Sequence, residues 1–234
     1  MAEDLSLKLY YFDITGKGEP IRLLLHYLGI AFEDYRFENR EEFADMKQSG
    51  KLMFGQVPAL EVTNKKDNSV TMLNQTSAIL RYVAKLGGTE NKSPYPSDAI
   101  LAAKVDAITD QETDCFTGVK VASYKGRFGF GFLEEHKELA DGAIKNQKEA
   151  VIPGHLGLLV KQLEDSTTGW IAGTEGPSIA EFTWMPALKW FSEEAAARGG
   201  NSVIDVDKFP KIKEWMEKFD NLSEIKEWRA KHTK

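Results

Sequence analysis

The stretch FGQVPALEV, residues 54–62, constrains the fold of this chain more than any other segment. Gly55 marks a turn, and Pro58 stands directly before a short apolar run that is typical of a strand. Because proline cannot donate to a sheet ladder, Pro58 belongs at the first position or the edge of that strand. A cis bond between Val57 and Pro58 would turn the Val57 backbone outward, where it could pair with an extended peptide ligand. The alternative is an ordinary proline between a loop and a strand.

The residues before this stretch predict a β-α-β unit. Residues 5–12 alternate in hydropathy, which predicts a strand with Tyr11 on its apolar side. Pro20 suits a first helical turn, apolar residues then recur with helical spacing, and Gly29 ends the helix. Residues 31–37 predict a second strand, and the helical crossover makes it parallel to the first.

The residues after Pro58 predict a hairpin and a helix. Residues 59–62 and 70–73 form apolar runs on either side of a polar turn, so we expect two antiparallel strands. Apolar residues from Ile79 onward have helical spacing, and Gly87 and Gly88 close that helix. Residues 41–51 are polar, and we expect them to be irregular or briefly helical.

The character of the sequence changes after Gly88. Residues 89–97 contain two prolines and no apolar run, which is typical of a linker, and the apolar spacing beyond them is helical. We therefore predict an α/β domain over residues 1–88 and an all-α domain over residues 98–234. Within the second domain, Ser178 and Glu181 have the spacing of a helix capping box.

Composition excludes several classes of function. The net charge of −6 and the absence of a basic stripe argue against nucleic-acid binding. Cys115 is the single cysteine, so internal disulfides are excluded and a reducing compartment is favoured. No apolar run reaches the roughly 18–20 residues of a membrane span. The first residues do not resemble a secretory signal, so we expect a cytoplasmic protein.

Four motifs, in chain order, resemble the cytosolic glutathione transferases. They are Tyr11-Phe12-Asp13 with Gly16 and Gly18, the segment 55–60, the segment 73–82, and the capping box at Ser178. The β-α-β, β-β-α order resembles the thioredoxin fold, but no Cys-x-x-Cys provides a dithiol for redox chemistry. The set is most similar to the sigma class, which includes the glutathione-dependent prostaglandin D synthases. The resemblance implies a thioredoxin-like glutathione-binding domain followed by a helical domain that carries the acceptor pocket.

The resemblance also implies a catalytic role for Tyr11. A free thiol has a pKa of roughly 8.5 and is mostly protonated at neutral pH. A hydroxyl that donates to the glutathione thiolate contributes about 1.5–3 kcal/mol, enough to lower that pKa by about one to two units. Alternation alone does not separate Tyr11 from Tyr10, and two aromatic core residues are the alternative interpretation.

Further contacts to glutathione are implied by position in the family motifs. The Val57 backbone would pair with the cysteinyl part, and Gln75 and Thr76 would hold the γ-glutamyl carboxylate at a helix N-terminus. Phe43 replaces the family's usual tryptophan at the glycyl end. The full set of glutathione contacts that we expect is Tyr11, Lys17, Phe43, Lys47, Gln56, Val57, Pro58, Gln75, Thr76 and Asp114. Lys17 stands where the sigma class usually has an arginine, which keeps the charge but loses the planar fork.

Three aspartates, Asp106, Asp110 and Asp114, fall on one face of a predicted helix. A solvated acidic face is one interpretation. The resemblance implies instead that Asp114 reaches across a dimer interface to the glutathione α-amine of the other subunit. We predict no metal and no resident cofactor, because glutathione is a co-substrate and the histidines lack ligand spacing.

Residues 124–132, YKGRFGFGF, depart from the family pattern. Three glycines give a mobile backbone, while the phenylalanines favour burial. We expect some of these rings to cover the acceptor pocket beside Tyr11. The alternative is that they dock on the flank of the helical domain or at a dimer interface.

Two classes of function remain. The first is a homodimeric glutathione transferase that conjugates a hydrophobic electrophile, with isomerase or peroxidase side activity. The second is a non-catalytic carrier or structural protein with the same fold, which turnover of an aromatic electrophile would exclude.

Overall fold

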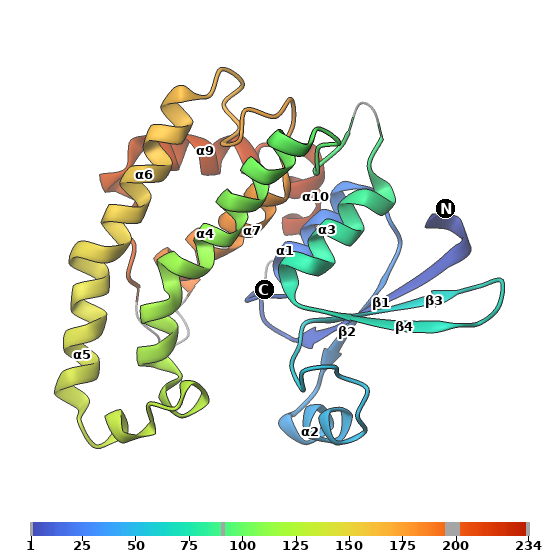
Figure 1. Cartoon of the computed structure of the whole chain (residues 1–234), viewed down its shortest axis with the longest axis horizontal. Helices are drawn as coiled ribbons and strands as arrows, with labels where there is room; N and C mark the ends of the chain where they lie inside the picture. The colour runs from blue at the N-terminus through green and yellow to red at the C-terminus, as the bar shows by residue number, and fades with distance from the viewer. Residues whose placement is uncertain (1, 90–91, 195–201, 233–234) are drawn as a thin grey trace.

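A computed structural model of the chain describes residues 2–89, 92–194 and 202–232. A mixed sheet with its helices forms one part, and a group of helices lies against it (Figure 1). Among the described residues no helix is long and apolar enough to cross a membrane.

The sheet has four strands in the order β2-β1-β3-β4. Strand β1 (Leu5–Phe12) pairs in parallel with β2 (Glu33–Phe37) and antiparallel with β3 (Ala59–Asn64). Strand β4 (Val70–Asn74) is antiparallel to β3. The predicted parallel crossover and the predicted hairpin are confirmed, although β2 begins two residues later than the pattern suggested.

Helices α1 (Glu19–Tyr27) and α3 (Thr76–Gly87) pack together on the side of the sheet toward the helical part (Figure 1). Their apolar spacing buries a stripe that includes Ile21 and Ile79, both fully inaccessible to solvent. Helix α2 (Arg40–Gln48) stands apart from both. The polar segment that we expected to be irregular or briefly helical is therefore a nine-residue helix, and Asn39 caps it by accepting the Glu42 N–H at 2.9 Å.

The described residues beyond the linker are helical, as predicted. Three short 3-10 turns lie in this part, at Lys125–Phe128, Gly131–Glu134 and Val206–Lys208, and one more precedes β1 at Ala2–Asp4. Two π-helical turns lie at Gln147–Val151 and Trp190–Glu194. The α-helices are α4 (Ala99–Ser123), α5 (Lys137–Asn146), α6 (Ile152–Asp165), α7 (Ile179–Lys189), α9 (Pro210–Asp220) and α10 (Ser223–His232). The exact domain boundaries at residues 88 and 98 stay a prediction.

The capping box at the start of α7 is present with both of its hydrogen bonds. Glu181 is fully buried, and it accepts from the Ser178 N–H at 2.8 Å and the Ser178 hydroxyl at 2.7 Å. The same carboxylate accepts the Ile171 N–H at 2.8 Å and the Trp215 indole N–H at 3.3 Å. The cap therefore also ties α7 to the preceding loop and to α9.

The sheet and the helices share one hydrophobic core. Buried residues run continuously from β1 through α1 and α3 into α4 and α7. The Tyr27 ring of α1 contacts the Phe182 ring of α7, with centroids 5.2 Å apart. This packing fixes the sheet edge relative to the helical wall that faces it.

Candidate active site

Strand pairing brings three predicted segments to one end of the sheet. Tyr10 pairs with Ala59, which in turn pairs with Asn74. One step further along each strand, Tyr11, Pro58 and Gln75 therefore stand in neighbouring positions. The Val57–Pro58 bond is cis, as predicted.

Tyr11 is the tyrosine that the fold turns toward the helical part. Its ring is buried, with 7% of the residue exposed, and its hydroxyl oxygen accepts the Lys17 N–H at 2.9 Å. Tyr10 points away from this site and donates its hydroxyl to Glu61 at 3.1 Å. The structure thus shows that Tyr11, and not Tyr10, faces this site, which alternation alone did not decide.

The glycines of the Tyr11 motif let the loop close over the tyrosine ring. Gly16 has a φ of +41°, and a Cβ there would lie 2.7 Å from the Tyr11 hydroxyl. A Cβ on Gly18 would lie 2.5 Å from the Tyr11 ring. Both contacts are shorter than a side chain tolerates, so the close approach of backbone to ring requires glycine at both positions.

The Tyr11 hydroxyl is protonated at neutral pH. Burial raises its pKa above the ordinary value of 10, while the Lys17 N–H and the charge of Arg22 offset only part of that rise. Because the oxygen already accepts one hydrogen bond, the O–H proton is the group that this tyrosine can offer to a ligand.

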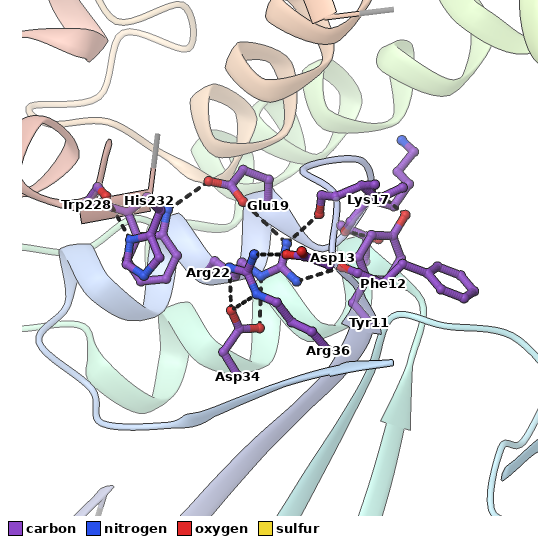
Figure 2. Close-up of polar contacts among 12 residues, drawn as sticks. Tyr11, Phe12, Asp13, Lys17, Glu19, Arg22, Asp34, Arg36, Trp228 and His232 are labelled. Atoms are coloured by element: carbon purple, nitrogen blue, oxygen red, sulfur yellow. Dashed lines mark hydrogen bonds and ion pairs between the residues drawn. The ribbon is translucent and has the colours of Figure 1, made fainter. Parts of the chain in front are cut away.

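Arg22 organises the loop that follows Tyr11. This fully buried arginine donates to Asp34 at 2.9 Å and to the backbone carbonyls of Ile14 at 2.7 Å and Phe12 at 3.1 Å. Figure 2 shows its guanidinium between Asp34 and Glu19. Sequence analysis missed this residue, although a charged residue inside the apolar stripe of α1 was a usable signal.

The C-terminal helix joins this network. Trp228 of α10 donates its indole N–H to Glu19 at 2.8 Å, and its ring stacks on His232 at a centroid distance of 3.8 Å (Figure 2). Helix α10 lies beside α1 in the fold (Figure 1). The loop that carries the Tyr11 contact is therefore braced from the far end of the chain.

Tyr11 opens into a cavity of about 500 Å³ between the end of strand β1 and helices α4 and α7. Its walls are largely apolar and aromatic, with a few charged groups, as is usual for small-molecule sites. The lining residues include Tyr11, Ile14, Lys17, Pro20, Glu112, Val119, Lys120, Tyr124, Arg127, Phe128, Pro186, Trp190 and Phe191.

Like Lys120, Glu112 is a charged residue of this cavity that sequence analysis missed. Its side chain is 2% exposed and pairs with Lys17 at 2.5 Å and with Lys120 at 3.4 Å. Burial alone would raise the pKa of this carboxyl, but the two lysines outweigh burial and lower it. Burial lowers the pKa of Lys120, and Glu112 offsets only part of this effect. Glu112 falls on the apolar stripe of α4, four residues after Ile108, and that position was a usable signal.

Family profiles match both halves of the chain. The glutathione S-transferase N-terminal domain matches residues 7–85, and the glutathione S-transferase C-terminal domain matches residues 127–232. Glutathione S-transferase 1 of Ascaris suum is 32% identical over 231 residues, which are 97% of each chain. The chain belongs to the glutathione S-transferase family.

Solved structures show the same transferase fold. Prostaglandin synthase D of Nilaparvata lugens has a TM-score of 0.75 and 25% identity, over 97% of this chain and 98% of that chain. A glutathione S-transferase of the hookworm Necator americanus, described as monomeric, has a TM-score of 0.71 and 26% identity over 98% of both chains. A thioredoxin-like domain followed by an all-α domain is thus confirmed, and the relatives named glutathione S-transferases support a transferase and do not favour the carrier alternative.

Hydrogen bonds connect several of the predicted glutathione-binding residues of this transferase to one another or to neighbouring strands. The Thr76 hydroxyl donates to the Lys17 carbonyl at 3.1 Å, which places the start of α3 against the Tyr11 loop. The Gln56 carbonyl accepts from the buried Asn74 amide at 3.0 Å, which ties the segment before Pro58 to β4. Gln75 has a φ of +73° and precedes the first turn of α3. Such a conformation costs about 1–3 kcal/mol in a residue other than glycine, and it is typical of binding sites.

Phe43 and Lys47 lie on α2, beyond the sheet edge. The Phe43 ring meets the Phe12 and Phe37 rings edge-on, with centroids 5.2 Å and 5.6 Å away. The side chain of Lys47 lies over Gly55, where an added Cβ would come within 3.0 Å of its Cε. Neither residue lines the cavity beside Tyr11.

The three aspartates of α4 divide between two environments. Asp106 accepts from Arg81 at 2.7 Å and from the Tyr95 hydroxyl at 2.8 Å, and Asp110 lies 3.4 Å from Arg81. These two aspartates therefore join α4 to α3. Asp114 is exposed on α4 and does not line the cavity.

The segment 124–132 divides in the same way. Tyr124 and Phe128 line the cavity with Tyr11, which confirms that part of this segment covers the pocket. Phe130 and Phe132 are 40% and 60% exposed and contact one another, with centroids 6.0 Å apart. Neither of these two rings lines the cavity, so only some of the rings of this segment cover it.

The protein's own cysteine is not poised as a nucleophile, and it does not line this cavity. Within the described ranges no three His, Cys, Asp or Glu side chains gather as a metal site. Cys115 is fully buried, and burial raises the pKa of its thiol to about 12, so the thiolate is scarce at neutral pH.

Proposed function

We propose that Tyr11 activates glutathione by donating its hydroxyl proton in a hydrogen bond to the thiolate sulfur. The observation that carries this proposal is the Lys17 N–H, 2.9 Å from the Tyr11 oxygen, in a site that also raises the phenol pKa. A protonated, oriented hydroxyl is a donor, and a charge-assisted bond to sulfur favours the thiolate over the thiol. The thiol proton then leaves to solvent before the sulfur reacts.

Glutathione would lie along the end of the sheet, beside Pro58 and Gln75. The Val57 backbone N–H and C=O would hydrogen-bond to its cysteinyl part, and Gln56 and Pro58 would form the adjacent turn. The γ-glutamyl carboxylate would meet Gln75, Thr76 and the N-terminus of α3, where backbone N–H groups favour an anion.

The glycyl end of glutathione would then reach toward α2, where Lys47 can pair with its carboxylate and Phe43 supports the wall. Lys17 stands between the two substrates, because its backbone holds Tyr11 and its side chain lines the cavity. The Lys17 ammonium group would favour negative charge near the sulfur, although its ion pair with Glu112 offsets part of this effect.

The second substrate would be a hydrophobic electrophile in the cavity between Tyr11 and α4. The thiolate attacks its electrophilic carbon and forms a C–S bond, and the leaving group departs with the electron pair of the broken bond. This chemistry needs no metal or resident cofactor. A role in detoxification follows from such a reaction.

The first experiment is turnover of 1-chloro-2,4-dinitrobenzene with glutathione by the purified chain. We expect chloride release and conjugate formation well above the uncatalysed rate. No conjugation of this or other aryl and enone electrophiles would contradict the proposal and revive the carrier or structural alternative.

We further propose that the chain belongs to the sigma class and forms a homodimer in the cytoplasm. The sequence motifs and the likeness to prostaglandin synthase D of Nilaparvata lugens support the class. The dimer would place Asp114 near the partner's glutathione α-amine, although the hookworm relative described as monomeric shows that the fold does not require one. The single buried Cys115 fits a reducing compartment, and localisation of a tagged chain would test this.

A further inference from the structure

The cavity beside Tyr11 carries an excess of positive charge, although the whole chain has a net charge of −6. Among the side chains that the structure describes, three cationic ones line it, namely Lys17, Lys120 and Arg127, against one carboxylate, that of Glu112. A neutral hydrophobic acceptor would gain nothing from this excess, whereas an anion would.

The carboxylate of Glu112 is already shared. One of its oxygens pairs with Lys17 at 2.5 Å and the other with Lys120 at 3.4 Å. Within the part of the chain that the structure describes, no carboxylate pairs with Arg127, whose guanidinium lies 5.9 Å from the Phe128 ring centre. Arg127 is thus the cation of the cavity that remains available to a ligand.

The positions of these groups separate the two substrates. The residues proposed for glutathione come from the sheet edge and the start of α3, whereas Arg127 and Phe128 lie in the segment that follows α4. The same cavity also has an apolar and aromatic wall, which includes Val119, Phe128 and Phe191. An acceptor with its reactive carbon at Tyr11 could rest its apolar body on this wall and present an anion to Arg127.

We propose that the acceptor site of this transferase selects apolar electrophiles that carry a carboxylate, with Arg127 as the specificity-determining residue. Lys120 adds a second positive charge to the same wall. This inference rests on the proposed function, because recognition of the carboxylate is measured through the attack of glutathione on the same molecule. A guanidinium and a carboxylate can form two parallel hydrogen bonds, which would also orient the ring of the acceptor.

The experiment compares 4-chloro-3,5-dinitrobenzoate with its methyl ester at saturating glutathione. Each kcat/KM is divided by the uncatalysed rate of the same acceptor with glutathione, which removes the difference in intrinsic reactivity. The variants are Arg127→Gln and Arg127→Lys, and the matched control is Lys125→Gln. Lys125 lies in the same segment and carries the same charge, but it does not line the cavity.

We expect the normalised benzoate-to-ester ratio to exceed one in the wild type and to fall about three- to fivefold in Arg127→Gln, the range of a partly exposed ion pair. Arg127→Lys should restore part of the ratio, Lys125→Gln should leave it unchanged, and about 0.5 M salt should reduce it in the wild type. Melting curves of the variants check that each is folded.

Equal falls for both acceptors, or the same fall in Lys125→Gln, would overturn the assignment of Arg127 while conjugation itself persists. A rise in KM for glutathione in Arg127→Gln, with the acceptor ratio unchanged, would place Arg127 at the other substrate and also overturn it. Failure of the wild type to conjugate either acceptor would refute the proposed function, and this inference with it.

Discussion

Replacing Tyr11 with phenylalanine removes one oxygen and one proton from a site whose other groups stay in place. Among the described residues, the hydroxyl oxygen accepts the Lys17 N–H alone, at 2.9 Å, so its own proton is what glutathione would lose. One charge-assisted hydrogen bond contributes about 1.5–3 kcal/mol, which corresponds to a rise of about one to two units in the pKa of the bound thiol.

The sign of the pH dependence follows from this shift. Below the thiol pKa the rate is proportional to the thiolate fraction, so Tyr11→Phe should lower kcat/KM by at least about tenfold at pH 6.5. The deficit should shrink as the pH rises through the thiol pKa of the variant, because both enzymes then hold thiolate. Glutathione binding should be nearly intact, since its other contacts come from separate residues.

Two measurements check this prediction. The pH profile of kcat/KM with an aryl halide reports the thiol pKa through the reaction, and the ultraviolet absorbance of bound thiolate reports it without an acceptor. The control is Tyr10→Phe, because Tyr10 donates to Glu61 and lies outside the cavity lining. An unchanged thiol pKa in Tyr11→Phe, or a loss of activity in Tyr10→Phe instead, would refute the role of Tyr11.

Four further predictions concern stability, assembly and access to the cavity. Ser178→Ala should lower the free energy of unfolding by about 0.5–2 kcal/mol without changing kcat per folded molecule, and an unchanged melting curve would contradict the capping argument. Arg22→Met should cost about 3–5 kcal/mol, since it removes a buried guanidinium that pairs with the part-exposed Asp34 carboxylate and donates to two backbone carbonyls, and urea midpoints measure this. Sedimentation equilibrium should give twice the chain mass of 26.3 kDa, and a monomer at micromolar concentration would remove Asp114 from the site. Shortening residues 126–131 should raise KM for bulky electrophiles far more than KM for glutathione, and equal effects would argue against a cover over the cavity.

Much of the fold could be predicted because its determinants are local. Alternation of apolar residues located β1, helical spacing located α1, and Pro58 marked the start of β3. The capping box at Ser178 was equally legible, because both of its hydrogen bonds join residues three positions apart. These features depend on backbone geometry within a few residues, which the order of the amino acids fixes.

The candidate site was only partly predictable. The motif around Tyr11 and the glycines at positions 16 and 18 pointed to the right loop, but alternation did not distinguish Tyr11 from Tyr10. Strand pairing made that distinction, because it put Tyr11 beside Pro58 on the side of the helices and turned Tyr10 toward Glu61. Phe130 and Phe132 were not predictable in this way, since the sequence of a loop does not show which surface its hydrophobic side chains contact.

What the tertiary structure alone decided is the charge of the site. By itself, the sequence places Glu112 within a helix and Arg22 within another, with no sign of their partners. Lys17 and Glu112 are 95 residues apart in the chain, and Trp228 reaches Glu19 across 209 residues. The free energy of a buried charge depends on which opposite charges and donors surround it, and folding alone brings those groups within hydrogen-bond distance.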